Sequence, residues 1–340
     1  MKSVKSVLKI LIPLALGIGL IIWFWNAMPE NDKTETINAF KRANYFWVLL
    51  APLVGFISNF IRTQRWRLML RPLGYYPGYW NTFFSVMIMY FFNLFVPRLG
   101  EVTRCSILAK YEKVPVEKSI GTMVTERLID VICLGIVVLI TLLLMGKANF
   151  LAMYDTFKAK TAGMGGSTIM TVLKWSIPFI IIFGLLAYSL LFIRKHGVDA
   201  LKEQMKNKIK SLMISVFSVK DIKEMPQFLL LTVGLWVTYL VMFYMNYKAL
   251  PETSNLPVVS ALVCLIFGSM AVVLTPGGIG IFPIIIQTIL MSFGVNPNSA
   301  LAIGMIAWAV QTLGMLIGGM LSLTLLSVLN KDANHETTAR

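Results

Sequence analysis

Charged residues are scarce in this sequence, and so are the residues that most often bind metals. Only 14% of the 340 residues are charged and 57% are apolar, whereas soluble domains average about 25% charged. The two histidines and three cysteines lie too far apart for a metal site or a disulfide framework. We therefore expect no metal site, no cofactor and no separate soluble domain in the short polar linkers.

The charge that is present is mostly of one sign. The chain has 31 Lys and Arg against 16 Asp and Glu, a net charge of +15. The basic residues cluster between apolar runs, as in cytoplasmic loops that face anionic lipid. Because no nucleic-acid-binding motif appears, we predict contact with anionic inner-leaflet lipids and no nucleic-acid partner.

Long apolar runs dominate the chain, whose mean hydropathy is +0.73. A membrane-spanning helix needs about 20 apolar residues. The first run exceeds a signal-peptide core, so we expect it to be a retained span. The pattern predicts an all-α polytopic membrane protein, with one transmembrane domain over 1–330 and a polar tail over 331–340. The apolar runs cover residues 7–25, 45–61, 80–96, 128–145, 175–193, 228–247, 256–274, 279–293 and 300–328.

Loop charge constrains how these runs cross the membrane. If each long run crossed once, loops 97–127 and 194–227, with six and eight basic residues, would both lie outside, against the positive-inside rule. The conflict disappears if 80–112 enters from the cytoplasmic side, turns near residues 97–100 and returns. The basic residues then divide into 23 on or towards the inside and 8 outside. Residues 256–293 would form a second re-entrant hairpin from the outside. This gives about six full spans, with both termini cytoplasmic.

Two basic segments are interpreted as features of topology. Residues 198–219 alternate apolar and Lys positions at helical spacing, which predicts an amphipathic helix on the inner leaflet. The segment RTQRWRLMLR, from Arg62 to Arg71, is interpreted as a cytoplasmic anchor and not as part of a site. The halves 45–145 and 228–328 run in opposite directions, and each contains one interrupted hydrophobic segment. Such pairs indicate an inverted-repeat transporter.

The first interruption, FFNLFVPRLGEVTR, places five unusual residues inside an apolar segment. Pro97 and Gly100 favour a break in the helix. A helix restarting near Glu101 would point free N–H groups at the turn, which suits a phosphate. Arg98 and Arg104 would add forked cationic donors, and Glu101 could pair with an arginine or couple to protons. The alternative is an ordinary interfacial loop with solvated charges.

The segment TERLID precedes an apolar helix and supplies further charges. Glu126 and Asp130 are four residues apart and share a helix face, with Arg127 beside them. Two acids there could neutralise Arg98 or Arg104. The alternative is that they only favour the positive end of the helix.

The second interruption is TPGGIG, formed by Thr275, Pro276, Gly277, Gly278, Ile279 and Gly280. It lacks the GK[ST] of a nucleotide-binding loop. We predict an unwound turn whose bare backbone approaches a ligand or the opposite hairpin, and a simple tight turn is the alternative.

These residues together resemble a known family. The motifs N-x3-P-R-x-G-E-x2-R from Asn93, E-R-x2-D from Glu126 and P-G-G-x-G from Pro276 resemble the flippase-like membrane family named for the transmembrane region of lysylphosphatidylglycerol synthase. The resemblance extends from about residue 7 to about 328. It implies a protein that moves a lipid across the cytoplasmic membrane. Two departures are expected to matter: there is no C-terminal aminoacyl-transfer domain, and Pro283 lies in the IFP segment where relatives often carry Glu.

A lipid transporter is the leading hypothesis. An anionic phosphate headgroup would be bound by Arg98 and Arg104 and screened by Glu101, Glu126 and Asp130, so we expect no enzymatic activity. The alternatives are a membrane-embedded lipid-phosphate transferase or hydrolase, in which Glu101 or Asp130 would be the base, and a non-transporting assembly protein. A homo-oligomer is left open, as are the lipid, the direction of transport and its energy source.

Overall fold

The computed structural model of the chain describes residues 29–96, 98–146, 214–274 and 276–331, together with residues 22, 26, 151 and 155. All regular structure in these ranges is helical. Pro97, Thr275, nearly all of the predicted first span and all of the span at 175–193 lie outside the described residues. So do most of the predicted amphipathic helix and residues 332–340.

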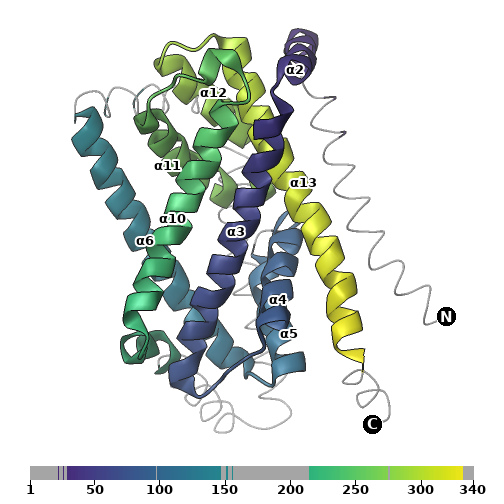
Figure 1. Cartoon of the computed structure of the whole chain (residues 1–340), viewed down its shortest axis with the longest axis vertical. Coiled ribbons are helices and arrows are strands. Elements are labelled where there is room, and N and C mark those ends of the chain that lie inside the picture. Colours follow the sequence, from purple (N-terminus) through teal and green to yellow (C-terminus); the bar gives the residue numbers. More distant parts are fainter. Residues whose placement is uncertain are drawn as a thin grey trace, which may run out of the picture.

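Four long helices form the body of the molecule (Figure 1). Each is long and apolar enough to cross a membrane, since at 1.5 Å per residue each exceeds about 30 Å. They confirm the spans predicted at 45–61, 128–145, 228–247 and 300–328, and α3 and α6 extend well beyond their apolar runs. The four are α3 (Tyr45–Leu70), α6 (Val116–Met145), α10 (Met225–Tyr247) and α13 (Pro297–Leu329).

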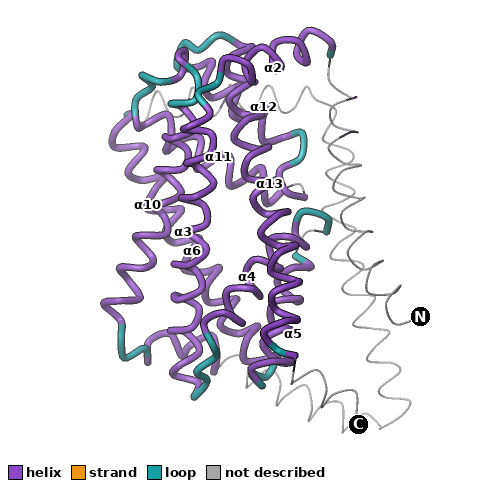
Figure 2. The backbone as a smooth tube through the Cα atoms, turned by 45° about the vertical axis from the view of Figure 1, so that its right-hand side comes forward, coloured by secondary structure: helices purple, strands orange, loops and turns teal. Residues whose placement is uncertain are grey.

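Two helical hairpins lie towards opposite ends of this body (Figures 1 and 2). The first pairs α4 (Tyr79–Asn93) with α5 (Leu99–Glu112), and the second pairs α11 (Val258–Leu274) with α12 (Ile281–Ser292). Both turns fall at the predicted interruptions. The hairpin helices span roughly 18–26 Å, which is less than the apolar thickness of a bilayer.

The tips of the two hairpins meet inside the molecule. Gly277 has a left-handed backbone (φ +58°), and a Cβ built on it would lie 2.8 Å from Leu94 Cδ2 in the first turn. The indole Nε1 of Trp308 donates to the carbonyl oxygen of Gly277 at 3.0 Å. Gly278 and Gly280 also have positive φ angles, which favour glycine. The bare backbone of this turn therefore approaches the opposite hairpin, as one of the two sequence interpretations proposed.

The turn of the first hairpin is closed by Asn93 and Gly100. The Asn93 side-chain oxygen accepts a hydrogen bond from the Gly100 N–H at 2.8 Å, so one N–H at the start of α5 is already paired. A Cβ on Gly100 would collide with the Met89 carbonyl oxygen and lie 2.7 Å from Asn93 Oδ1. Glycine at this position allows α4 and α5 to pack backbone against backbone.

Gly100→Ala is expected to separate the two helices of the first hairpin. Overpacking costs about 1–3 kcal/mol or more when backbone atoms must move, so the variant should lose several degrees of melting temperature in detergent. Gly135→Ala is the matched control, because a Cβ on that α6 glycine meets no described atom within 4 Å. Equal melting curves for the two variants would refute the close packing at Gly100.

Residues 26–44, which lie between the first two predicted apolar runs and are mixed in charge, contain a helix, α2 (Glu30–Arg42). It packs on α13, where the Thr36 hydroxyl lies 3.4 Å from the Met305 sulfur. Arg42 forms an ion pair with Glu252 at 2.9 Å. Mixed charge alone did not reveal this helix, because its buried face is narrow.

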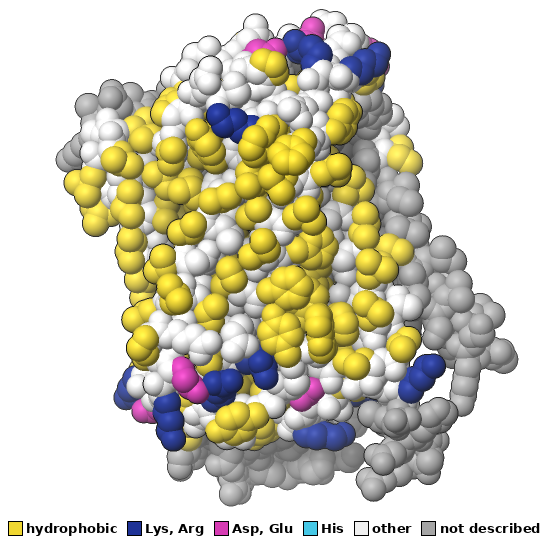
Figure 3. All heavy atoms as spheres, in the orientation of Figure 1, with side chains coloured by type: hydrophobic (Ala, Val, Ile, Leu, Met, Phe, Trp, Pro, Cys, Tyr) yellow, Lys and Arg dark blue, Asp and Glu magenta, His cyan; other side chains and the backbone are white. Residues whose placement is uncertain are grey.

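The outer surface is apolar between the two ends of the molecule. Figure 3 shows hydrophobic side chains over the middle of one face and charged side chains gathered towards both ends. Exposed leucines are common on the long helices, including Leu143 at 77% and Leu230 at 73% exposure. Soluble monomers rarely expose so much apolar surface, whereas a lipid-facing helix does.

Candidate functional site

Charged side chains from α3, α5 and α6 meet inside the bundle, with Glu126 at the centre. Glu126 is fully buried. Its Oε1 accepts hydrogen bonds from Arg62 and, at 3.2 Å, from Arg65, while its Oε2 accepts one from Arg104 at 2.8 Å. One carboxylate thus joins three helices. The complete cluster consists of Arg62, Arg65, Glu101, Arg104, Glu126, Arg127 and Asp130.

Asp130 lies one helical turn beyond Glu126 on the same face of α6, as their spacing predicted. Arg65 Nη2 donates to Asp130 Oδ1 at 2.7 Å, and Arg62 Nη2 lies 3.5 Å from Asp130 Oδ2. Both α3 arginines therefore contact both acids, which holds α3 against α6.

Arg127 connects α6 to the first hairpin. Its Nη2 donates to Glu101 Oε1 at 3.3 Å, and its Nη1 lies 3.8 Å from Asp130. With 43% of its side chain exposed, it is the most accessible charged group of the cluster. The prediction that Glu101 pairs with an arginine is confirmed.

The cluster contains four guanidinium groups and three carboxylates, so it carries one excess positive charge when all are ionised. Buried nitrogens of Arg65 and Arg104 have no hydrogen-bond partner in the described part of the chain. The Arg104 guanidinium also lies over the Trp66 ring, 4.2 Å from its centroid. Buried charge that is not balanced is costly, and an anion would offset it.

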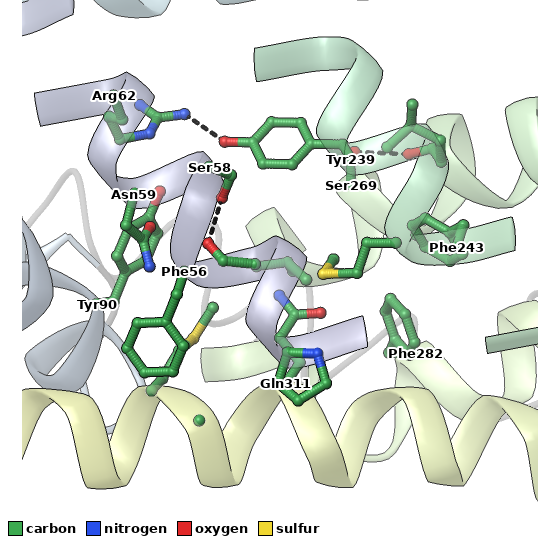
Figure 4. A pocket seen from close by; sticks show the side chains of 18 of the residues that line it. Phe56, Ser58, Asn59, Arg62, Tyr90, Tyr239, Phe243, Ser269, Phe282 and Gln311 are labelled. Carbon is green, nitrogen blue, oxygen red and sulfur yellow. Dashed lines mark hydrogen bonds between the residues drawn. The ribbon is translucent and has the colours of Figure 1, made fainter. Parts of the chain in front are cut away.

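A cavity of about 260 Å³ adjoins this cluster. Arg62 and Arg127 line it, together with Tyr90 and Tyr239. Figure 4 shows Arg62 donating to the Tyr239 oxygen, a distance of 2.8 Å. Residues of α3, α4, α6, α10, α11, α12 and α13 contribute to the wall, so the cavity lies between the two hairpins.

The structure brings together five of the residues predicted to form the site: Glu101, Arg104, Glu126, Arg127 and Asp130. The predicted neutralisation of Arg104 by an acid of α6 is confirmed.

Arg98 is exposed and forms no ion pair with any described residue, so its proposed neutralisation by Glu126 or Asp130 is not formed.

The remaining predicted residues shape the turns. Asn93 and Gly100 close the first turn, and Pro276, Gly277, Gly278 and Gly280 build the second. Pro283, where relatives often carry an acid, is buried, and its backbone packs closely against Gly304 of α13.

The interpretation of Arg62 and Arg65 as only a cytoplasmic anchor, and not as part of a site, was wrong. Both are buried, at 4% and 0% exposure, in the ion cluster. Their spacing of three places them on one face of α3, and this was the signal in the sequence. Other lining residues that sequence analysis missed, such as Asn59, Tyr239 and Gln311, are polar residues within apolar runs.

The apolar helices, the hairpins and the buried charges define a helical polytopic membrane protein. The chain belongs to the family described as the lysylphosphatidylglycerol synthase TM region, which matches residues 10–319.

A UPF0104 membrane protein of Methanocaldococcus jannaschii is 29% identical over 99 residues. That match covers 28% of this chain and 30% of the relative, so it spans less than a third of the relative's length. No solved structure matches the chain significantly.

Proposed function

We propose that this protein moves a lipid with an anionic phosphate headgroup across the membrane. The headgroup would occupy the cavity while the acyl chains stay in the bilayer. The observation that supports this proposal is the position of Arg62 and Arg127 on the cavity wall, beside a cluster with one excess positive charge. Arginine forks match phosphate oxygens in geometry and charge.

The size of the cavity favours a headgroup over a whole lipid. Pockets for drug-sized ligands are usually about 300–1,000 Å³, and this one is about 260 Å³. The acyl chains would stay in the bilayer, against the apolar outer surface of the helices, while the headgroup occupies the cavity.

The residues that bind the headgroup differ from the initial expectation. Arg104 is fully buried and paired with Glu126, so we assign it a supporting role. Arg127 and Arg62 replace it as phosphate ligands in the proposal. The role of Arg98 stays a prediction.

Arg127→Gln is expected to slow lipid translocation about 10- to 100-fold, because a charged hydrogen bond contributes about 1.5–3 kcal/mol. The assay is the transfer of a fluorescent phosphatidylglycerol across proteoliposomes that contain the purified protein. Arg42→Gln is the control, since Arg42 lies in an exposed ion pair and does not line the cavity.

Two results would contradict the proposal. One is translocation by Arg127→Gln at the wild-type rate. The other is a wild-type protein that gives no translocation above empty liposomes. Mass spectrometry of the extracted lipids adds a third reading, because an altered product would support the membrane-enzyme alternative.

We further propose that the two hairpins are re-entrant and that the α4–α5 hairpin enters from the cytoplasmic side of the cell membrane. Basic residues are more numerous at the end of the molecule that carries the free ends of this hairpin, as the positive-inside rule requires. That end holds Arg67, Arg71, Lys110, Lys113, Lys118, Lys220, Lys223 and Lys331, and the opposite end holds Lys33, Lys41, Arg42 and Lys248.

Cysteine labelling tests this orientation. In a background without native cysteines, Lys118→Cys should react with an impermeant maleimide only after the cytoplasmic side is exposed. Glu252→Cys should react in intact cells. The opposite pattern at both positions would reverse the proposed orientation.

A further inference from the structure

The polar groups of the cavity are not all charged. Figure 4 shows Arg62 and Tyr239 near one part of the cavity, and Asn59 and Gln311 elsewhere on its wall. Asn59 lies nearly one helical turn from Arg62 along α3 and Gln311 comes from α13. Among the described lining residues there are two arginines and no carboxylate. The cavity therefore offers positive charge and neutral amides, and offers no negative charge.

Several of these neutral groups have unused hydrogen-bonding capacity. Asn59 Nδ2 has only the Met87 sulfur as acceptor, at 3.3 Å, and sulfur is a weak acceptor. The Gln311 amide makes no hydrogen bond to the described residues. The Tyr239 oxygen accepts from Arg62, which leaves its own hydroxyl proton free to donate.

A headgroup with hydroxyls would supply hydrogen-bond partners for these neutral lining groups. A hydroxyl both donates and accepts, so it can bind to either end of an amide that has no strong partner. An ammonium group only donates, and the charged groups among the described lining residues are the two arginines. The rings of Phe56, Phe243 and Phe282 could attract a cation, but the like charges oppose it.

We infer that the cavity selects a phosphate ester whose headgroup carries hydroxyls, such as a glycerol or a cyclic polyol, and rejects headgroups with an ammonium group. Arg62 and Arg127 bind the phosphate, while Asn59 and Gln311 bind the hydroxyls. This inference rests on the proposed function and specifies its class of substrate.

Four short-chain lipids test the selection on the purified protein in detergent, with intrinsic tryptophan fluorescence reporting the Kd. Phosphatidylglycerol and phosphatidylinositol carry hydroxyls. Phosphatidylethanol has the same net charge as phosphatidylglycerol and no headgroup hydroxyl, and phosphatidylethanolamine adds the ammonium. We expect the hydroxyl-bearing lipids to bind about tenfold more tightly than phosphatidylethanol, as one or two hydrogen bonds would give. Phosphatidylethanolamine should bind no better than phosphatidylethanol.

Variants assign the selection to the two amides. Gln311→Leu and Asn59→Leu should each weaken phosphatidylglycerol binding towards the level of phosphatidylethanol and leave phosphatidylethanol binding unchanged. Arg127→Gln should weaken both lipids. The melting temperature of each variant is measured first, and if one amide variant fails to fold, the other still tests the selection.

The outcomes separate this inference from the proposed function. Equal binding of phosphatidylglycerol and phosphatidylethanol, or binding of phosphatidylethanolamine as tight as that of phosphatidylglycerol, would overturn the selection while leaving an anionic-lipid transporter intact. Failure of every anionic lipid to bind, together with no translocation in liposomes, would overturn both.

Discussion

Glu126→Gln is expected to be among the most destabilising substitutions in this protein that remove a charge without changing side-chain volume. The carboxylate accepts from Arg62, Arg65 and Arg104 in a fully buried position. Its loss would raise the excess charge of the cluster from one to two without changing the volume of the side chain. Removing one partner of a buried ion pair costs about 3–5 kcal/mol. Thermal unfolding in detergent, followed by tryptophan fluorescence, should show a melting temperature lower by many degrees.

A second substitution can show that the charge is the cause. Among the described residues, Arg104 forms an ion pair with Glu126 alone. Adding Arg104→Gln to Glu126→Gln therefore removes the unbalanced cation and should restore part of the lost stability. Glu30→Gln is the surface control, because Glu30 forms an ion pair with Lys33 and its side chain is 85% exposed. Exposed pairs contribute about 0–1 kcal/mol. A double variant less stable than Glu126→Gln would refute the charge explanation.

The sequence was sufficient for the four long helices and for the position of both hairpins, although it did not reveal α2. Length and apolarity located α3, α6, α10 and α13, since a helix in lipid must satisfy its own backbone. The positions of the hairpins were predicted from the glycines and prolines of the two interruptions and from the charge of the loops. The packing at Gly277 and Leu94 could not be predicted, because a turn that tolerates close approach does not say which segment approaches it.

The candidate site was predicted only in part. Glu126 and Asp130 shared a face by their spacing, and an arginine partner followed from the cost of burying acids. The sequence could not choose between Arg98 and Arg104, because they lie six residues apart at a break whose geometry decides which one turns inward. It also misplaced Arg62 and Arg65. A basic segment beside an apolar run satisfies the positive-inside rule whether its arginines face water or acids in a distant helix.

Under the proposed function, the buried arginines of the ion cluster stabilise the fold, and those on the cavity wall bind the headgroup. Arg65 and Arg104 have no exposed surface and line no part of the cavity, so they hold α3 and α5 to α6. Arg62 and Arg127 belong to both features. A headgroup that binds Arg127 would compete with Glu101 for it, and Glu101 lies on the first hairpin. Binding would then weaken the contact between that hairpin and α6, which offers a direct way to couple the headgroup to movement of the hairpin.

Filling the cavity is expected to stop transport without unfolding the protein. Gly314 of α13 lines the cavity, and a Cβ built on it would lie 3.8 Å from Pro52 on the facing wall. Gly314→Phe would therefore place an aromatic ring in the space assigned to the headgroup while leaving every charged group in place. We expect translocation of phosphatidylglycerol in proteoliposomes to fall to the rate of empty liposomes, a larger effect than that of Arg127→Gln.

Gly135→Phe is the matched control for this prediction. It introduces the same ring on the exposed side of α6, where a Cβ meets no described atom within 4 Å, and it should transport at the wild-type rate. Gly135→Phe should keep the wild-type melting temperature, because its ring enters lipid. Gly314→Phe should still fold, because its Cβ makes an ordinary contact with Pro52 at 3.8 Å and its ring extends from a residue that lines the cavity. Undiminished transport by a folded Gly314→Phe variant would mean that the headgroup crosses elsewhere, since a path through this cavity cannot survive its filling.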